Sequence, residues 1–259
     1  MTYNKIPRAL MALIVLIFTL ALAGCSGIAP GVLGQNQQLL TFCPKDGKLA
    51  TLIDDDETGS RVDPVTTQQD QLVIEQEVTQ TAVCNGRLTV EMFSSSSGST
   101  ATVYDQDVDL PGATDNARLL QVPAAVKKIM KQIRANWAPA LATLPQDGTD
   151  IAGLYRLAGE YDEQLIAGTS LNWVILTDGF NNLGGIDLDT QALSPAQAQA
   201  LAAQVPVPNL KDASITVVGL GRVAGSPAPS AVIDGLVDFY NAVCANTHAA
   251  KCLSVTDWK

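Results

Sequence analysis

The interpretation of the whole chain starts from one stretch, LATLIDDDETGS, which spans residues 49–60. Its apolar first half predicts a short buried strand over residues 48–53, and the acidic and hydroxyl half predicts a loop at the end of that strand. Asp56, Thr58 and Ser60 are spaced i, i+2, i+4. In a sharp loop this spacing can aim three oxygen groups at one point, and hard cations such as Mg²⁺ prefer oxygen ligands. The stretch therefore predicts a metal site where the first strand ends.

Two later stretches have the composition expected of partners for this loop. The first is the turn Asp147-Gly148-Thr149-Asp150-Ile151, which precedes a helical pattern. The second is the apolar run Trp173-Val174-Ile175-Leu176-Thr177-Asp178-Gly179, which reads as a central strand ending at an aspartate. Both present hydroxyl and carboxylate groups at the end of an element, as the first stretch does.

Helical and strand patterns alternate along the rest of the chain. Helices are predicted over residues 64–83, 114–141 with a break near Pro123, 149–163, 194–204 and 230–245. Further strands are predicted over residues 87–93, 101–110, 172–177, 215–220 and 253–256. This alternation predicts a doubly wound α/β fold, with a mostly parallel central sheet and helices on both faces. Ligands of such sheets bind beyond the carboxyl ends of the strands, so the three stretches are expected to meet at one edge.

The first 24 residues differ from the body of the chain. Lys5 and Arg8 precede an apolar run that ends in Leu22-Ala23-Gly24-Cys25. A basic head, an apolar core and small residues before a cleavage point are typical of a secretory signal. The ending resembles a bacterial lipobox, which implies removal of residues 1–24 and lipid attachment to Cys25. The alternatives are a plain signal peptide with a chance cysteine, or an uncleaved anchor. Residues 25–44 would be the lipidated cysteine and its tether, with residues 26–40 flexible.

The remaining 235 or so residues are long enough for one large domain or two small ones. Loss of Lys5 and Arg8 changes the formal net charge from −10 to −12. An acidic surface argues against nucleic acid as a partner and against electrostatic binding to anionic lipid head groups. Attachment to the extracytoplasmic face of the cell membrane would then depend on the acyl chains of Cys25.

The three motifs together resemble those of the von Willebrand factor type A (vWA) family. Asp56-x-Thr58-x-Ser60 is similar to that family's Asp-x-Ser-x-Ser metal loop, with threonine as the middle hydroxyl. Gly148-Thr149-Asp150-Ile151 is similar to its threonine segment, and Leu176-Thr177-Asp178-Gly179 to its second aspartate segment. The resemblance extends from about residue 45 to residue 259, nearly the whole exported chain.

The resemblance implies a metal-ion-dependent adhesion site formed by Asp56, Thr58, Ser60, Thr149 and Asp178. It implies binding and not turnover, because a cation with few charged ligands keeps an open position for a partner's Asp or Glu. The partner expected is therefore a protein that presents a carboxylate. By size and ligand type the metal expected is Mg²⁺, with Ca²⁺ or Mn²⁺ possible.

One departure from the family opens an alternative. The residues before the first aspartate are usually apolar in vWA domains, whereas here they are Asp54 and Asp55. Asp54-x-Asp56-x-Thr58 after an apolar run resembles the nucleophile motif of haloacid-dehalogenase-type phosphatases. Asp54 would attack phosphorus, Asp56 would act as general acid and base, and Thr177 could form the second motif. That family also needs an acidic pair after a later strand, where this chain has Gly219-Leu220-Gly221-Arg222. A third reading is a solvated acidic loop without metal.

Four cysteines follow Cys25, and in an exported chain they predict two disulfides. Spacing alone allows three pairings. His248 lies midway between Cys244 and Cys252, so a zinc site is an alternative, although a fourth ligand is missing. The predicted order of elements places all four cysteines at the end of the sheet opposite the metal edge. The predicted pairs are then Cys43–Cys84 and Cys244–Cys252.

Overall fold

The computed structural model describes residues 31–258, except residues 62, 96–99, 146–147, 184, 189–191 and 226. The predicted signal segment, the lipidation site Cys25 and Asp147 lie outside the described residues. Among the helices of the described part, none is long and apolar enough to cross a bilayer.

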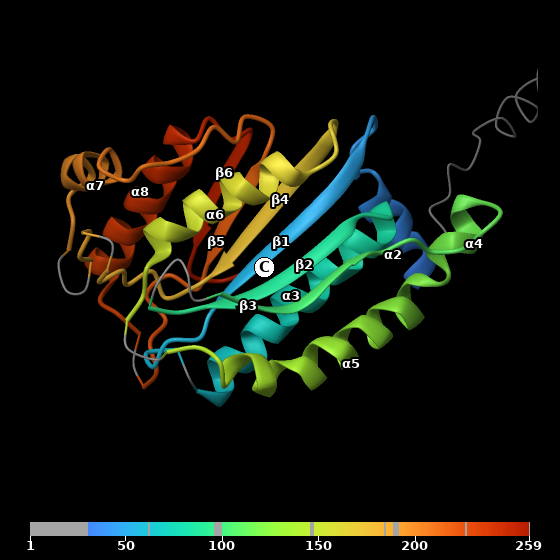
Figure 1. The fold of residues 1–259 in the computed structure, drawn as a ribbon, viewed down its shortest axis with the longest axis horizontal. Coiled ribbons are helices and arrows are strands. Elements are labelled where there is room, and N and C mark those ends of the chain that lie inside the picture. The colour runs from blue at the N-terminus through green and yellow to red at the C-terminus, as the bar shows by residue number, and fades with distance from the viewer. Residues whose placement is uncertain are drawn as a thin grey trace, which may run out of the picture.

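A six-stranded sheet forms the centre of the domain, in the order β3-β2-β1-β4-β5-β6 (Figure 1). The strands are β1 (Lys48–Asp56), β2 (Arg87–Phe93), β3 (Thr100–Asp107), β4 (Thr169–Leu176), β5 (Ser214–Val218) and β6 (Lys251–Val255). All neighbours are parallel except β2 and β3, which pair antiparallel through a hairpin. After β1 the chain forms β2 and β3 on one side of β1, and it then returns to form β4 on the other side of β1. The strand order therefore reverses between β1 and β4, where doubly wound folds bind their ligands.

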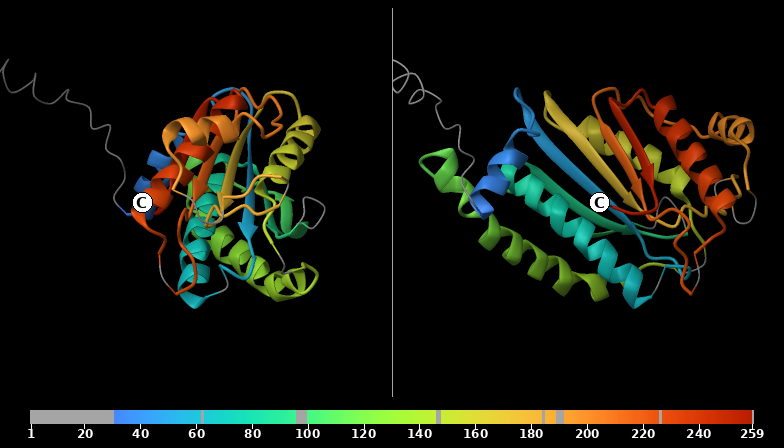
Figure 2. Two further views of the ribbon diagram at one scale, coloured as in Figure 1. Left: turned by 90° about the vertical axis from the view of Figure 1, so that its left-hand side faces the viewer. Right: turned by 180° about the vertical axis from the view of Figure 1, so that it is seen from behind.

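Helices cover both faces of the sheet (Figure 2). They are α2 (Val32–Leu40), α3 (Pro64–Cys84), α4 (Asp115–Leu119), α5 (Val122–Leu141), α6 (Ile151–Gln164), α7 (Pro195–Ala202) and α8 (Ser230–Asn246). Successive strand residues point to opposite faces. In β4, Trp173 and Ile175 therefore pack in a core with α6, α7 and α8, whereas Val174 and Leu176 pack in a second core with α3 and α5. The predicted doubly wound α/β class is confirmed.

Local sequence signals explain the ends of α3. Asp63 caps the helix by accepting hydrogen bonds from the backbone N–H groups of Val65 and Thr66, and Pro64 occupies the first turn. Asn85 ends the helix in the left-handed conformation, with φ of 51°. The predicted helix over residues 64–83 is thus confirmed to within one residue at its C-terminus.

Several predicted boundaries differ from the structure by a few residues, and two differences matter for the function. Strand β1 does not end at Ile53 but continues through Asp56, so Asp54, Asp55 and Asp56 pair with β2 as strand residues and are all buried. The part of the expected flexible tether that the structure describes is instead α2, which packs against α3 and α4. Asn36 of α2 donates a hydrogen bond from Nδ2 to the carbonyl oxygen of Leu119, 3.0 Å away, which fixes the helix on its neighbour.

Both predicted disulfides are confirmed. Cys43 pairs with Cys84, and Cys244 pairs with Cys252. The first joins the segment before β1 to the end of α3, and the second joins the end of α8 to β6. Because both cysteines beside His248 are oxidised, the zinc alternative is wrong, and His248 itself is exposed.

The two disulfides are expected to stabilise the domain unequally. They close loops with sequence separations of 41 and 8 residues. In the chain-entropy model, Cys43→Ala/Cys84→Ala should lower the free energy of unfolding by about 4 kcal/mol and Cys244→Ala/Cys252→Ala by about 2.5 kcal/mol. Urea unfolding of the two double variants beside the wild type measures this ranking. A larger loss from the shorter loop would show that its effect comes from native packing and not from chain entropy.

The buried Glu77 predicts a pH-dependent stability. Glu77 of α3 is 7% exposed, and burial raises its pKa from 4.5 to about 7 although Asn172 donates a hydrogen bond to it. The folded chain therefore keeps a proton that the unfolded chain releases. The contribution of Glu77 to the free energy of unfolding is complete below pH 4.5 and is lost as the pH rises through about 7. Glu77→Gln, which keeps the acceptor, should raise stability at pH 8 by about 2 kcal/mol and change it little at pH 4.

The matched control for this experiment is Glu75→Gln on the same helix, because the Glu75 side chain is 49% exposed. Urea unfolding of both variants at pH 4 and pH 8 gives the comparison. An equal effect of the two substitutions at pH 8 would contradict the prediction.

Candidate metal centre at the carboxyl edge of the sheet

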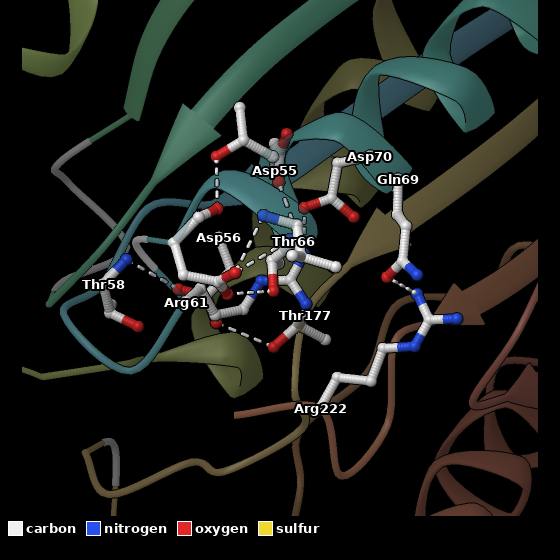
Figure 3. Close-up of polar contacts among 12 residues, drawn as sticks. Asp55, Asp56, Thr58, Arg61, Thr66, Gln69, Asp70, Thr177 and Arg222 are labelled. Carbon is white, nitrogen blue, oxygen red and sulfur yellow. Dashed lines mark hydrogen bonds and ion pairs between the residues drawn. The ribbon is translucent and has the colours of Figure 1, made fainter. Parts of the chain in front are cut away.

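Two separate segments bring hydroxyl groups together at the reversal of strand order. Thr58 and Ser60 follow β1, and Thr149 precedes α6. The Thr149 hydroxyl donates to Thr58 Oγ1 at 3.2 Å, and Thr58 Oγ1 lies 3.4 Å from Ser60 Oγ. The backbone N–H of Thr58 donates to Asp56 Oδ1 at 3.0 Å, which holds the loop in its sharp turn (Figure 3). The structure thus brings these predicted site residues into one cluster.

Asp56 lies at the floor of this cluster. It is 2% exposed, and its Oδ2 accepts a hydrogen bond from the Thr177 hydroxyl at 2.7 Å. Thr177 in turn accepts from the backbone N–H of Gly179, so its hydroxyl is oriented by both partners. In the sequence, Thr177 belongs to the segment that resembles the vWA second-aspartate segment, but a role of its own is predicted for it only in the phosphatase alternative. Its place directly after an apolar strand could have marked it as the residue that positions Asp56.

Asp178 completes the predicted set from the end of β4. Its Oδ1 accepts the backbone N–H of Phe180 at 3.1 Å, whereas its Oδ2 is buried and makes no hydrogen bond of ordinary geometry, although the Ser60 hydroxyl lies close enough to lower the pKa of the carboxyl. Burial, and next the negative charge of Asp56, raise the pKa of Asp178 to about 6. Buried polar atoms are rarely left unpaired in folded proteins. A cation beside Oδ2 would supply the missing partner and stabilise the ionised carboxylate.

A hollow of about 460 Å³ opens above the cluster. Its walls come from the metal loop, from the segment before α6 and from the segments after β4 and β5; they are Thr58, Gly59, Ser60, Gly148, Thr149, Phe180, Asn182 and Val223. The hydroxyl residues Thr58, Ser60 and Thr149 line this hollow, and the buried carboxylates of Asp56 and Asp178 lie below its surface. A cation at the cluster could therefore be reached from solvent.

The donor set fits a hard divalent cation. Two carboxylates and three hydroxyls are oxygen ligands of the kind that Mg²⁺ binds, and few of them carry charge. Among the described residues no three His, Cys, Asp or Glu side chains are grouped as metal ligands, so binding here would depend on the hydroxyls.

Two asparagines fix the segment that carries Thr149, and the sequence analysis missed both. Asn182 Oδ1 accepts the backbone N–H of Thr149 at 2.9 Å, and Asn181 Oδ1 accepts that of Ile151 at 2.8 Å. Gly148 allows this approach, because its φ is 141° and an added Cβ would lie 3.0 Å from Asn182 Oδ1. The signal available in the sequence was the Asn-Asn pair shortly after Asp178.

The other acidic residues of the run have separate partners. Asp54 Oδ2 accepts a hydrogen bond from Trp173 Nε1 at 2.6 Å inside the core of α6 and α8, and burial raises its pKa to about 8. Asp55 points to the opposite face, where Arg61 Nη2 lies 3.8 Å from its Oδ1. The two aspartates that stand where vWA domains usually have apolar residues are therefore buried strand residues, each with a partner outside the strand.

No family model matches the chain, and no curated protein matches it. Solved structures with a similar arrangement include proximal thread matrix protein 1 from the mussel byssus, with 13% identity over 82% of this chain and 44% of that chain and a TM-score of 0.40. The same protein with a zinc-occupied MIDAS motif has a TM-score of 0.36 at 13% identity, covering 82% and 42% of the two chains. The pilus adhesin SpaC from Lactobacillus rhamnosus GG, in its open conformation, has 11% identity over 83% of this chain and 28% of that chain, with a TM-score of 0.44.

The chain spans less than half the length of these solved proteins, which are matrix and adhesion proteins. At this level of similarity the comparison adds nothing to the site. The α/β class rests on the strand order and helix layers described above, and the metal centre rests on its own geometry.

Proposed function

We propose that this chain is a lipid-anchored extracytoplasmic protein whose vWA-like domain binds a protein partner through a divalent cation. The observation that carries the proposal is the convergence of Asp56, Thr58, Ser60, Thr149 and Asp178, whose buried Oδ2 makes no hydrogen bond of ordinary geometry. Mg²⁺ is the cation proposed, with Ca²⁺ or Mn²⁺ as alternatives, because all the donors are oxygen atoms.

The bound cation would supply an open coordination position for a carboxylate of the partner. The chain's own groups have the other roles. Thr58, Ser60 and Thr149 provide neutral oxygens, Asp56 and Asp178 provide the negative charge, and the hollow gives a partner access. Because three of the five donors are neutral, the ligands together carry no more negative charge than the divalent cation, which leaves it able to accept an external anionic ligand.

The position of α2 supports an outward orientation. The described chain begins at α2, beside the amino ends of the strands, whereas the metal centre lies at their carboxyl ends (Figure 1). An acyl chain on Cys25 would place the α2 end near the membrane, since the intervening residues 26–30 span at most about 18 Å when extended. The metal centre would then point away from the bilayer toward partners.

The phosphatase alternative is not favoured by the geometry. A nucleophile must reach phosphorus, but Asp54 is 3% exposed and its carboxylate is bonded to the indole of Trp173 in the core. The account expects no release of phosphate from an aryl phosphate in the presence of Mg²⁺. Measurable turnover that disappears in Asp54→Asn would favour the phosphatase reading instead.

Retention on a carboxymethylated matrix tests the proposed binding. An acidic protein is repelled by a carboxylate surface, so the chain from residue 26 onward should pass through the column in EDTA. With Mg²⁺ or Mn²⁺ it should be retained, and EDTA should release it. Asp178→Asn, which removes one charged ligand, should lose this retention. Equal retention of the wild type and of the variant would contradict the proposal.

A further inference from the structure

The side chain of Arg61 lies beneath the candidate metal centre. Arg61 follows Ser60, the last hydroxyl of the metal loop, and its side chain is only 2% exposed. Its Nη2 contacts Asp70 Oδ2 of α3 at 2.6 Å and lies 3.8 Å from Asp55 Oδ1 of β1. Figure 3 shows the guanidinium among Asp55, Asp56, Asp70 and Thr177.

The chain leaves room for this guanidinium at the end of β5. Gly219 has φ of 103°, and an added Cβ there would lie 2.8 Å from Arg61 Nη1 and 2.7 Å from the Thr177 carbonyl oxygen. A side chain at position 219 would therefore displace Arg61. The guanidinium thus occupies a space bounded by the ends of β1, β4 and β5.

Carboxylates from three elements face Arg61. They are Asp55 and Asp56 of β1, Asp70 of α3 and Asp178 after β4. An arginine guanidinium stays protonated in proteins, so the side chain is a permanent cation among these carboxylates. The other cation near Asp70 is Arg222, which is more exposed and contacts Gln69 and Asp257.

Arg61 is held more by charge than by hydrogen bonds. Its Nε and Nη1 are buried without hydrogen-bond partners, and so are both carboxylate oxygens of Asp55. A guanidinium that served only as a structural brace would be expected to use its planar fork of donors. Here one close ion pair to Asp70 anchors a cation in an acidic space.

We propose that Arg61 is a built-in counter-cation of the metal loop, residues 56–60. Its positive charge compensates the carboxylates under the loop when no metal is bound. The same charge weakens the binding of a divalent cation when no partner carboxylate is present. This inference rests on the proposed metal centre. A metal loop without such a cation would need the metal for its own stability. With Arg61, the domain stays folded while the metal enters and leaves, and the carboxylate of a partner contributes a larger share of the affinity.

The substitution Arg61→Met tests the inference, because it keeps an unbranched apolar stem but removes the charged guanidinium. In EDTA the variant should unfold at a lower temperature than the wild type, and Mn²⁺ should raise its midpoint by more than it raises that of the wild type. By calorimetry its Kd for Mn²⁺ should be at least about tenfold lower, since removal of one nearby positive charge favours a divalent cation. A purely structural arginine would give the opposite sign, with weaker Mn²⁺ binding after its loss.

The matched control is Arg118→Met. Arg118 is also a buried arginine, 8% exposed, but it lies beside α3's C-terminal end and donates to the carbonyl oxygen of Val83 at 2.6 Å. This variant should lose stability equally in EDTA and in Mn²⁺, with an unchanged Kd for Mn²⁺.

The outcomes separate this inference from the proposed function. Tighter Mn²⁺ binding in Arg61→Met, or a variant that folds in Mn²⁺ but not in EDTA, supports the inference. Equal or weaker binding in the variant than in the wild type overturns the inference alone, as does a variant that folds under neither condition. Absence of Mn²⁺ binding from both proteins overturns the proposed metal centre together with it.

Discussion

Trp173→Ala is expected to lower the free energy of unfolding by about 5 kcal/mol. Trp173 is fully buried in β4 and packs edge-to-face against Tyr155, with ring centroids 4.9 Å apart. Truncation of a buried tryptophan costs about 3–5 kcal/mol through lost burial and the cavity left behind. It also removes the donor to Asp54, and an unpaired buried acceptor costs about 1–3 kcal/mol more.

Urea unfolding measures this loss, with Trp258→Ala as the matched control. Trp258 is partly exposed near the end of the chain, where its indole N–H bonds Gln76 of α3. Its truncation should cost about 1–2 kcal/mol, because less apolar surface returns to water. If the two variants were equally destabilised, Trp173 would not be the centre of the core between the sheet and α6.

Asp178→Asn is expected to weaken Mn²⁺ binding at least about 100-fold. The substitution keeps the shape of the side chain and an acceptor for the Phe180 N–H, but it removes one of the two charges of the centre. At a separation near that of a metal–oxygen bond, such a charge contributes several kcal/mol, and about 2.7 kcal/mol already corresponds to 100-fold. Isothermal titration calorimetry with Mn²⁺ and then Mg²⁺ gives both affinities.

The control for this variant is Asp54→Asn, the same chemical change at another buried aspartate. Asp54 lies two residues before Asp56, but its carboxylate faces Trp173 and not the metal centre. Its replacement should leave the Kd for Mn²⁺ within about threefold of the wild type, since the Trp173 N–H still finds an acceptor. Loss of binding in Asp54→Asn with retention in Asp178→Asn would place the cation elsewhere.

The sequence was sufficient to predict the order of elements from β1 onward, the edge of the sheet where the candidate site residues meet and both disulfide pairs. These features depend on local patterns and on the rules for connecting strands. Apolar runs set the central strands, Asp63-Pro64 and Asn85 set the ends of α3, and the connection rules place Cys43 near Cys84. The same rules bring Thr149 beside Thr58 although they are separated by 91 residues.

The length of β1 could not be predicted in this way. Aspartate is disfavoured in strands, so three in a row indicate a loop. In the structure each aspartate is compensated by a partner outside the strand: Trp173 for Asp54 and Thr177 for Asp56, both about 120 residues away, and Arg61, six residues away, for Asp55. Such pairs become visible only when the tertiary structure is known, because local propensity carries no information on them.

The roles of Arg61 and α2 were missed for related reasons. Arg61 follows a polar loop and carries no sequence signal of a role, but the fold turns its side chain inward toward Asp70. Residues 32–40 read as part of a tether because Gly, Asn and Gln make up the middle of this segment. They are ordered by packing against α3 and α4.

The most direct test of the central claim is a crystal structure of the chain from residue 26 onward, grown with Mn²⁺ and measured at the manganese absorption edge. The account predicts one anomalous peak coordinated by the Asp56 loop, with Thr58, Ser60, Thr149 and Asp178 directed toward it. A peak bound by Asp54 or Asp55, or no peak in the hollow between these residues at millimolar Mn²⁺, would contradict the account.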